Sequence, residues 1–91
     1  MTTIAFDVDG TLIHLTGEKE DTPRREIIQL FLSFQQLGYE MYCWSGGGES
    51  YAEMWLRRLY LDAKVVEKGS FLPDIAVDDE HVKLGKVNLK V

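Results

Sequence analysis

The chain of 91 residues has the length of one small domain, and its content of 45% hydrophobic and 27% charged residues is that of a folded globular protein. We therefore interpret residues 1–91 as a single domain, which excludes a multi-domain enzyme and a disordered chain. The 10 basic and 15 acidic side chains give a net charge of −5, which repels phosphate backbones and argues against a general nucleic-acid-binding protein.

The first part of the chain predicts a buried strand followed by a loop. Residues 3–8 are almost wholly apolar up to Asp7, as in a strand that is covered on both faces of a parallel sheet. Asp7 would then lie at the carboxyl end of this strand. Residues 14–22 are polar and contain Gly17, so we expect an exposed loop there, which we call the flap.

Two amphipathic helices are predicted on either side of a second strand. Thr22 is a favourable N-cap and Pro23 suits the first helical position, and apolar residues then recur at helical spacing until Gly38 ends the helix. Residues 39–44 are rich in strand-forming side chains and end abruptly at a serine and three glycines. Residues 49–60 again have apolar side chains at helical spacing.

The remaining residues predict short strands and complete an α/β fold. We expect strands at residues 64–66, 75–77 and 87–91, the last two joined by a polar loop that is too short for a helix. Strands that alternate with helices indicate a mostly parallel sheet. The predicted fold class is therefore a Rossmann-like sheet of about five strands with flanking helices.

Polar side chains gather at the carboxyl ends of these predicted strands, where ligands bind in open α/β sheets. Close carboxylates repel each other by about 4 kcal/mol per pair at an intermediate dielectric, so a cluster of them implies a cation. All the candidate ligands are oxygens, which favours Mg²⁺. The residues at this edge are Asp7, Asp9, Ser45, Gly46, Gly47, Gly48, Asp78, Asp79 and either Lys64 or Lys68.

Three segments resemble motifs of a known family. Residues 6–11, Phe-Asp-Val-Asp-Gly-Thr after a hydrophobic strand, resemble the first signature of the haloacid dehalogenase superfamily of phosphatases. Ser45, which follows the hydrophobic run 41–44 and precedes a glycine, resembles the second motif. Residues 75–80, Ile-Ala-Val-Asp-Asp-Glu, resemble the fourth motif. The motifs occur in the order of that family, and the resemblance implies its catalytic core without a cap domain.

This resemblance implies a magnesium-dependent phosphatase that acts through an aspartyl-phosphate. Asp7 would be the nucleophile. Asp9 would protonate the leaving oxygen and then activate the hydrolytic water. The carboxylate of Asp7, the backbone carbonyl of Asp9 and one or both of the carboxylates of Asp78 and Asp79 would bind Mg²⁺.

The same resemblance implies a phosphate-binding set. Ser45 would donate its hydroxyl to a phosphoryl oxygen, assisted by the backbone N–H groups of Gly46 and Gly47. A lysine would neutralise the charge on the nucleophile and on the phosphoryl group. Lys68 is the preferred residue, because it follows the third predicted strand, whereas Lys64 begins that strand and would lie at the far edge.

The segment between Leu12 and Pro23 leaves room only for the small flap, which shapes our expectations about partners. An uncovered site would accept a bulky phosphorylated substrate, or a second copy of the chain would cover it. Two other hypotheses remain: a receiver-like signalling module, and a degenerate family member that binds metal or phosphate without turnover. The order of the motifs argues against a receiver, in which paired acids follow the first strand.

Features elsewhere in the sequence set an expected location. Cys43 is the only cysteine, so the chain cannot form an internal disulfide, which fits a reducing compartment. No apolar run approaches the roughly 20 residues that span a bilayer, and the first residues lack the basic start of a signal peptide. We expect a cytoplasmic protein with no membrane partner.

Overall fold

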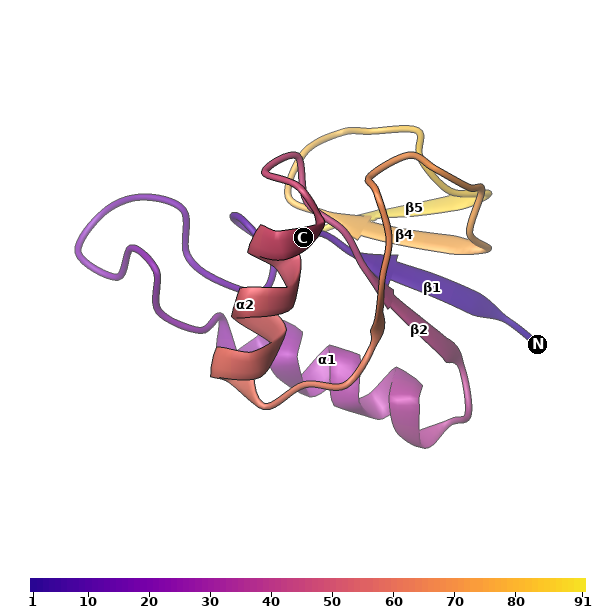
Figure 1. Ribbon diagram of the computed structural model, residues 1–91, viewed down its shortest axis with the longest axis horizontal. Helices are drawn as coiled ribbons and strands as arrows, with labels where there is room; N and C mark the ends of the chain where they lie inside the picture. The colour runs from indigo at the N-terminus through magenta and orange to yellow at the C-terminus, as the bar shows by residue number, and fades with distance from the viewer.

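The computed structural model describes residues 1–91 and contains an all-parallel sheet with two helices. The elements in chain order are β1 (Thr3–Phe6), α1 (Arg25–Gln36), β2 (Glu40–Cys43), α2 (Glu49–Leu59), β3 (Lys64–Val65), β4 (Ile75–Asp78) and β5 (Val87–Lys90). The five strands are arranged in the order β3-β2-β1-β4-β5. Every neighbouring pair is parallel, which confirms the predicted α/β sheet (Figure 1).

Both helices cover the same face of the sheet (Figure 1). The main hydrophobic core lies between them and the sheet, and Phe6 and Phe31 meet in it with their ring centroids 5.0 Å apart. The connections from β3 to β4 and from β4 to β5 contain no helix, so only coil covers the opposite face. Here Ala5, Trp44 and Ala76 are buried beneath side chains that include Phe71. The helices therefore flank one face only.

The start of α1 differs from the prediction. The helix begins at Arg25, and neither Thr22 nor Pro23 is part of it. Pro23 instead forms an isolated antiparallel bridge with Ile13, and the N–H of Arg24 donates to the carbonyl of Leu12, which keeps residues 23 and 24 extended. The predicted N-cap was wrong because this tertiary pairing closes the base of the flap before the helix can begin.

The other helix ends follow the sequence closely. Gly38 has a φ of +86°, a conformation in which glycine readily ends a helix, and α1 stops two residues before it. α2 begins at Glu49 as predicted and ends at Leu59, with Tyr60 in the left-handed region at φ 57°. Neither helix has the length and apolarity that crossing a bilayer requires.

The start of β1 is fixed to the loop before β4 by a carboxylate. Asp74 Oδ2 accepts hydrogen bonds from the backbone N–H of Thr3 at 2.8 Å and from its hydroxyl at 3.2 Å. Lys86 Nζ lies 3.3 Å from the other oxygen. The hydrogen bond from the Thr3 N–H and the ion pair with Lys86 hold the pKa of Asp74 below its ordinary value of 3.8.

This arrangement predicts a pH-dependent contribution to stability. Because the pKa of Asp74 is lowered by folding, its contribution is present above the ordinary carboxyl pKa of 3.8 and is lost as the pH falls through the lower value of the folded state. We expect Asp74→Asn to lower the Tm at neutral pH and to have progressively less effect in acid. Thermal unfolding of both proteins across a pH series tests this, and an equal difference in Tm at all pH values would contradict it.

Candidate active site

The strand order brings the predicted site residues to one edge of the sheet. β1 is the central strand, and the chain passes from β3 across it to β4, so the sheet changes its direction of winding between β1 and β4. Crevices at such points are the usual ligand sites of open α/β sheets. The backbone N–H of Asp7 donates to Val77 O at 3.0 Å, which extends the pairing and places Asp7 beside the end of β4.

The ammonium group of a lysine contacts the carboxylates at the ends of β1 and β4. Lys68 Nζ lies 3.1 Å from Asp7 Oδ1 and 3.0 Å from Asp78 Oδ2. Asp7 and Asp78 are buried, with 5% and 2% of their surfaces exposed. Lys64 lies at the other end of β3, where its ammonium pairs with Glu40 at 2.8 Å. Of the two lysines considered, Lys68 is the one at the carboxylate cluster.

Burial and charge perturb the protonation of this cluster. Burial, reinforced by the negative charge of Asp78, raises the pKa of Asp7 from 3.8 to about 6, although the charge and hydrogen bond of Lys68 oppose the increase. Burial alone would lower the pKa of Lys68, but the hydrogen bonds and charges of Asp78 and Asp7 outweigh it and raise the pKa above its ordinary value of 10.5. Lys68 therefore stays charged at neutral pH, and Asp7 ionises at the cost of repulsion from Asp78.

A third carboxylate completes a group with the geometry of a metal site. Oxygens of Asp7, Asp78 and Asp79 all lie within 4.8 Å of one another. The pKa of Asp79 is raised by burial and by its acidic neighbours Asp78 and Glu80. These three side chains bring more negative charge together than Lys68 neutralises, and they offer only oxygen donors. The group fits a hard divalent cation.

The turn after β1 fits closely around Asp79. Gly10 has a φ of +78°, and a Cβ atom at this position would lie 2.2 Å from Asp79 Oδ2. The hydroxyl of Thr11 lies 3.4 Å from Asp79 Oδ1 and 3.5 Å from Asp7 Oδ2, distances too long for strong hydrogen bonds. Arg24 Nη1 donates to the carbonyl of Gly10 at 2.6 Å and fixes the turn from outside. The backbone at position 10 therefore favours glycine, and a larger residue there would displace the carboxylate of Asp79.

Asp9 lies beside this group and has a different partner. Its Oδ1 accepts a hydrogen bond from the hydroxyl of Tyr51 on α2 at 2.6 Å. The carboxylate of Asp9 is not one of the three clustered carboxylates. The structure thus separates the side chain of Asp9 from those of Asp7, Asp78 and Asp79.

The turn after β2 consists of Ser45 and three glycines, and it leads into α2. Ser45 is 5% exposed, and its Oγ accepts a hydrogen bond from the N–H of Gly47 at 3.0 Å, which leaves the hydroxyl proton of Ser45 free. Gly46 and Gly47 line the same cavity as the carboxylates, and Ser45 is not one of the lining residues. Gly48, with a φ of +101°, then leads into α2.

The residues described above surround an open cavity of about 280 Å³. Its lining contains five carboxylates and one lysine, so an anionic ligand would be repelled unless a cation were also bound. The flap contributes Leu15, which is 48% exposed, to the rim. The lining residues are Asp7, Asp9, Leu15, Gly46, Gly47, Lys68, Asp78, Asp79 and Glu80.

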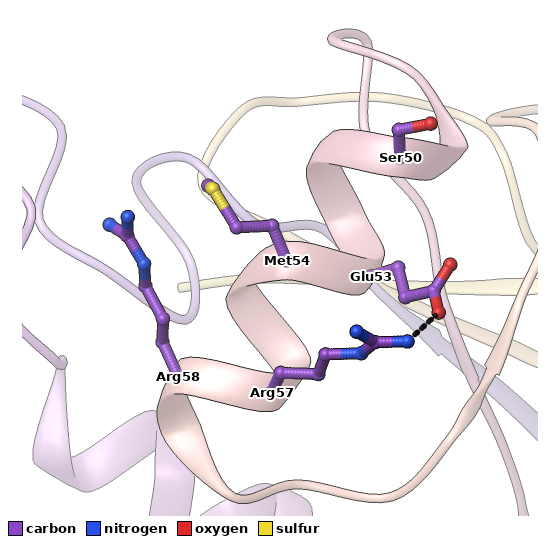
Figure 2. Close-up of a pocket in the computed structure, with 5 residues that line it drawn as sticks. All are labelled: Ser50, Glu53, Met54, Arg57 and Arg58. Carbon is purple, nitrogen blue, oxygen red and sulfur yellow. Dashed lines mark hydrogen bonds and ion pairs between the residues drawn. The ribbon is translucent and has the colours of Figure 1, made fainter.

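A second hollow lies on the outward face of α2 and lacks this chemistry (Figure 2). Glu53 and Arg57, one turn apart, form an ion pair at 2.8 Å there, and the side chain of Arg58 extends along the helix without an acidic partner. Such exposed pairs contribute little to stability or recognition. This hollow contains no cluster of carboxylates like the one at the edge of the sheet.

Sequence reasoning missed several residues at the site. Tyr51 was overlooked because a tyrosine in the first turn of a helix has no sequence signal that connects it to Asp9, 42 residues earlier. The sequence places Leu15 in an exposed loop and gives no sign that it borders a cavity. Glu80 and Thr11 were visible within the motifs, but only the folded chain shows that Glu80 lines the cavity and that Thr11 lies between two carboxylates.

Comparisons of this chain with family models, with curated proteins and with solved structures find no match.

Proposed function

We propose that this protein is a magnesium-dependent phosphomonoester hydrolase that acts through an aspartyl-phosphate, as expected of a small haloacid-dehalogenase-like core without a cap. The observation that supports this most strongly is the double contact of Lys68 with Asp7 and Asp78, with Asp9 lining the same cavity. A nucleophile, a charge-neutralising lysine and a separate acid then meet at one edge. The glycine turn after β2 adds N–H groups suited to a phosphoryl group.

The first half of the reaction forms the intermediate. An oxygen of the Asp7 carboxylate attacks phosphorus, and the bond between phosphorus and the ester oxygen breaks. The electron pair of that bond leaves with the oxygen, which takes a proton from the Asp9 carboxyl group, so the product is a neutral alcohol. Lys68 offsets the negative charge that develops on the transferring group.

The second half regenerates the enzyme. Asp9, now a carboxylate, accepts a proton from water while the water oxygen bonds to phosphorus. The bond between phosphorus and Asp7 breaks, and its electron pair returns to the carboxylate. The N–H groups of Gly46 and Gly47, which line the cavity, would hold the phosphoryl oxygens through both halves. Ser45 Oγ–H would add a third donor by turning toward the cavity, which Ser45 does not line in the structure.

The excess of negative charge at the site supports the binding of a divalent cation. Asp7, Asp78 and Asp79 would hold it, and the carbonyl of Asp9 is the further ligand that the family resemblance implies. When bound, Mg²⁺ supplies a positive charge that reduces the repulsion between the carboxylates and a phosphate dianion. The substrate is a phosphorylated molecule, and the open rim places no narrow limit on its size.

Release of phosphate from para-nitrophenyl phosphate, with and without Mg²⁺, tests this proposal. We expect Mg²⁺-dependent turnover by the unmodified protein and none by Asp7→Asn. The matched control is Asp62→Asn, which makes the same chemical change at an exposed side chain away from the site and should leave turnover intact. Turnover by Asp7→Asn would contradict the proposal. Binding of Mg²⁺ without turnover by the unmodified protein would also contradict it, and would favour a non-catalytic metal- or phosphate-binding module.

A further inference from the structure

We propose that Tyr51 is a positioning residue that fixes the carboxylate of Asp9 for proton transfer. This inference rests on the proposed function, because it concerns the group that we assign as general acid and base. Tyr51 does not line the cavity, so it would act through Asp9 rather than on the substrate.

The hydrogen bond from Tyr51 involves only one of the two carboxylate oxygens of Asp9. The hydroxyl of Tyr51 donates to Asp9 Oδ1 at 2.6 Å, a short distance typical of a strong bond to a carboxylate. Asp9 Oδ2 makes no hydrogen bond within the chain. One oxygen is therefore anchored, and the other remains available to a leaving group or to water in the cavity that Asp9 lines.

The ring of Tyr51 is itself held in place by two contacts. A Cβ atom at position 47 would lie 3.1 Å from Cδ2 of Tyr51, so the ring occupies the space that glycine leaves free at Gly47. Tyr51 also packs against the main core, which includes Trp55, the residue one turn later in α2. A side chain fixed by a turn and a core presents its hydroxyl in one direction, which is what a positioning residue requires.

The anchor of the Asp9 carboxylate is a single hydrogen bond from the hydroxyl of Tyr51. Without the hydroxyl, the carboxylate of Asp9 would be free to rotate, and the fraction of molecules with Oδ2 in a productive position would fall.

The effect of Tyr51→Phe should depend on the leaving group, which separates positioning from a general structural role. A para-nitrophenolate ion leaves without a proton, whereas an alkoxide such as that from β-glycerol phosphate requires one from Asp9. We expect Tyr51→Phe to lower kcat/KM for β-glycerol phosphate by about 10-fold to 100-fold and to change it little for para-nitrophenyl phosphate. The value of kcat/KM covers the steps from substrate binding to departure of the alcohol, so it includes the acid step and excludes the later hydrolysis of the aspartyl-phosphate.

Tyr42→Phe is the matched control. The hydroxyl of Tyr42 also donates to a carboxylate, Glu40 Oε1, at 2.7 Å, but β2 begins at this glutamate, on the opposite edge of the sheet from the site. Tyr42→Phe should leave kcat/KM unchanged for both substrates. Equal losses on both substrates in Tyr51→Phe, or no loss on either, would overturn the positioning role.

A measurement without turnover keeps the two proposals distinguishable. The NMR couplings between the Hα and Hβ protons of Asp9 report whether its side chain occupies one rotamer. We expect one rotamer in the unmodified protein and averaged couplings in Tyr51→Phe, and unchanged couplings would overturn the inference. If the unmodified protein hydrolysed neither substrate, the proposed function would fail, and these couplings would still decide whether Tyr51 positions Asp9.

Discussion

Asp9→Asn should slow hydrolysis of an alkyl phosphomonoester by about 10²-fold to 10⁴-fold, the usual contribution of a general acid and base. Asparagine keeps the size of the side chain and can still accept the hydrogen bond from Tyr51, but it cannot supply a proton to the alcohol or take one from water. Both halves of the reaction should therefore slow. With para-nitrophenyl phosphate, which needs no acid, the phosphorylated enzyme should accumulate because its hydrolysis lacks a base.

Steady-state rates and Mg²⁺ titrations of the same variant test this expectation together. The carboxylate of Asp9 is separate from the cluster formed by Asp7, Asp78 and Asp79, so Asp9→Asn should bind Mg²⁺ about as well as the unmodified protein. Undiminished turnover would exclude Asp9 as the general acid. A loss of Mg²⁺ binding equal to the loss of rate would instead assign its role to the metal site.

Gly10→Ala should damage both the fold and the metal site. Position 10 has a φ of +78°, which costs a residue with a Cβ atom about 1–2 kcal/mol. The added Cβ would also clash with the carboxylate of Asp79, which must then leave the position that it occupies beside Asp7 and Asp78. We expect a lower free energy of unfolding and an affinity for Mg²⁺ that is about 10-fold to 100-fold weaker, as when the support of a metal ligand is lost.

Gly17→Ala separates these two effects. Gly17 in the flap has a similar φ of +87°, but nothing lies within 4 Å of the position of its Cβ atom. The Gly17→Ala protein should therefore lose stability without losing affinity for Mg²⁺. Denaturant unfolding and calorimetric titration of both variants measure the two quantities, and equal affinities in Gly10→Ala and Gly17→Ala would contradict a role for Asp79 in binding the cation.

The order of elements could be predicted because each one has a local signal. The apolar run before Asp7 and the strand formers before Ser45 predict buried parallel strands, and both are present. Gly38 also marks the end of α1, and the three glycines after Ser45 mark the beginning of α2. Because the carboxyl ends of parallel strands share an edge, the positions of Asp7 and Asp78 follow from the strand assignments alone.

Features that depend on contacts distant in sequence could not be predicted. The start of α1 is displaced by the pairing of Pro23 with Ile13, which outweighs the favourable N-cap signal of Thr22. The packing of Phe71, in the coil after β3, against Trp44 on the second face of the sheet also joins side chains that are far apart in the sequence. Neither contact has a periodicity or a motif.

At the candidate site, too, some features could be predicted from local signals and others depend on contacts that are distant in the sequence. Lys68 could be favoured over Lys64 from its place after the third strand, and the structure brings it to the carboxylates. Its simultaneous contact with two of them depends on the path of the coil between β3 and β4. The hydrogen bond between Tyr51 and Asp9 connects α2 to the turn after β1, and only the folded chain reveals it.

Detection of a phosphoryl group on Asp7 during turnover tests the central claim most directly. Asp9→Asn mixed with para-nitrophenyl phosphate and Mg²⁺ is quenched in acid and reduced with borohydride, which converts an aspartyl-phosphate to homoserine. Peptide mass spectrometry then locates the reduced residue. The proposed mechanism predicts homoserine in place of Asp7 and at no other position. Turnover with no modified residue, or with the phosphoryl group on Ser45 or another side chain, would contradict it.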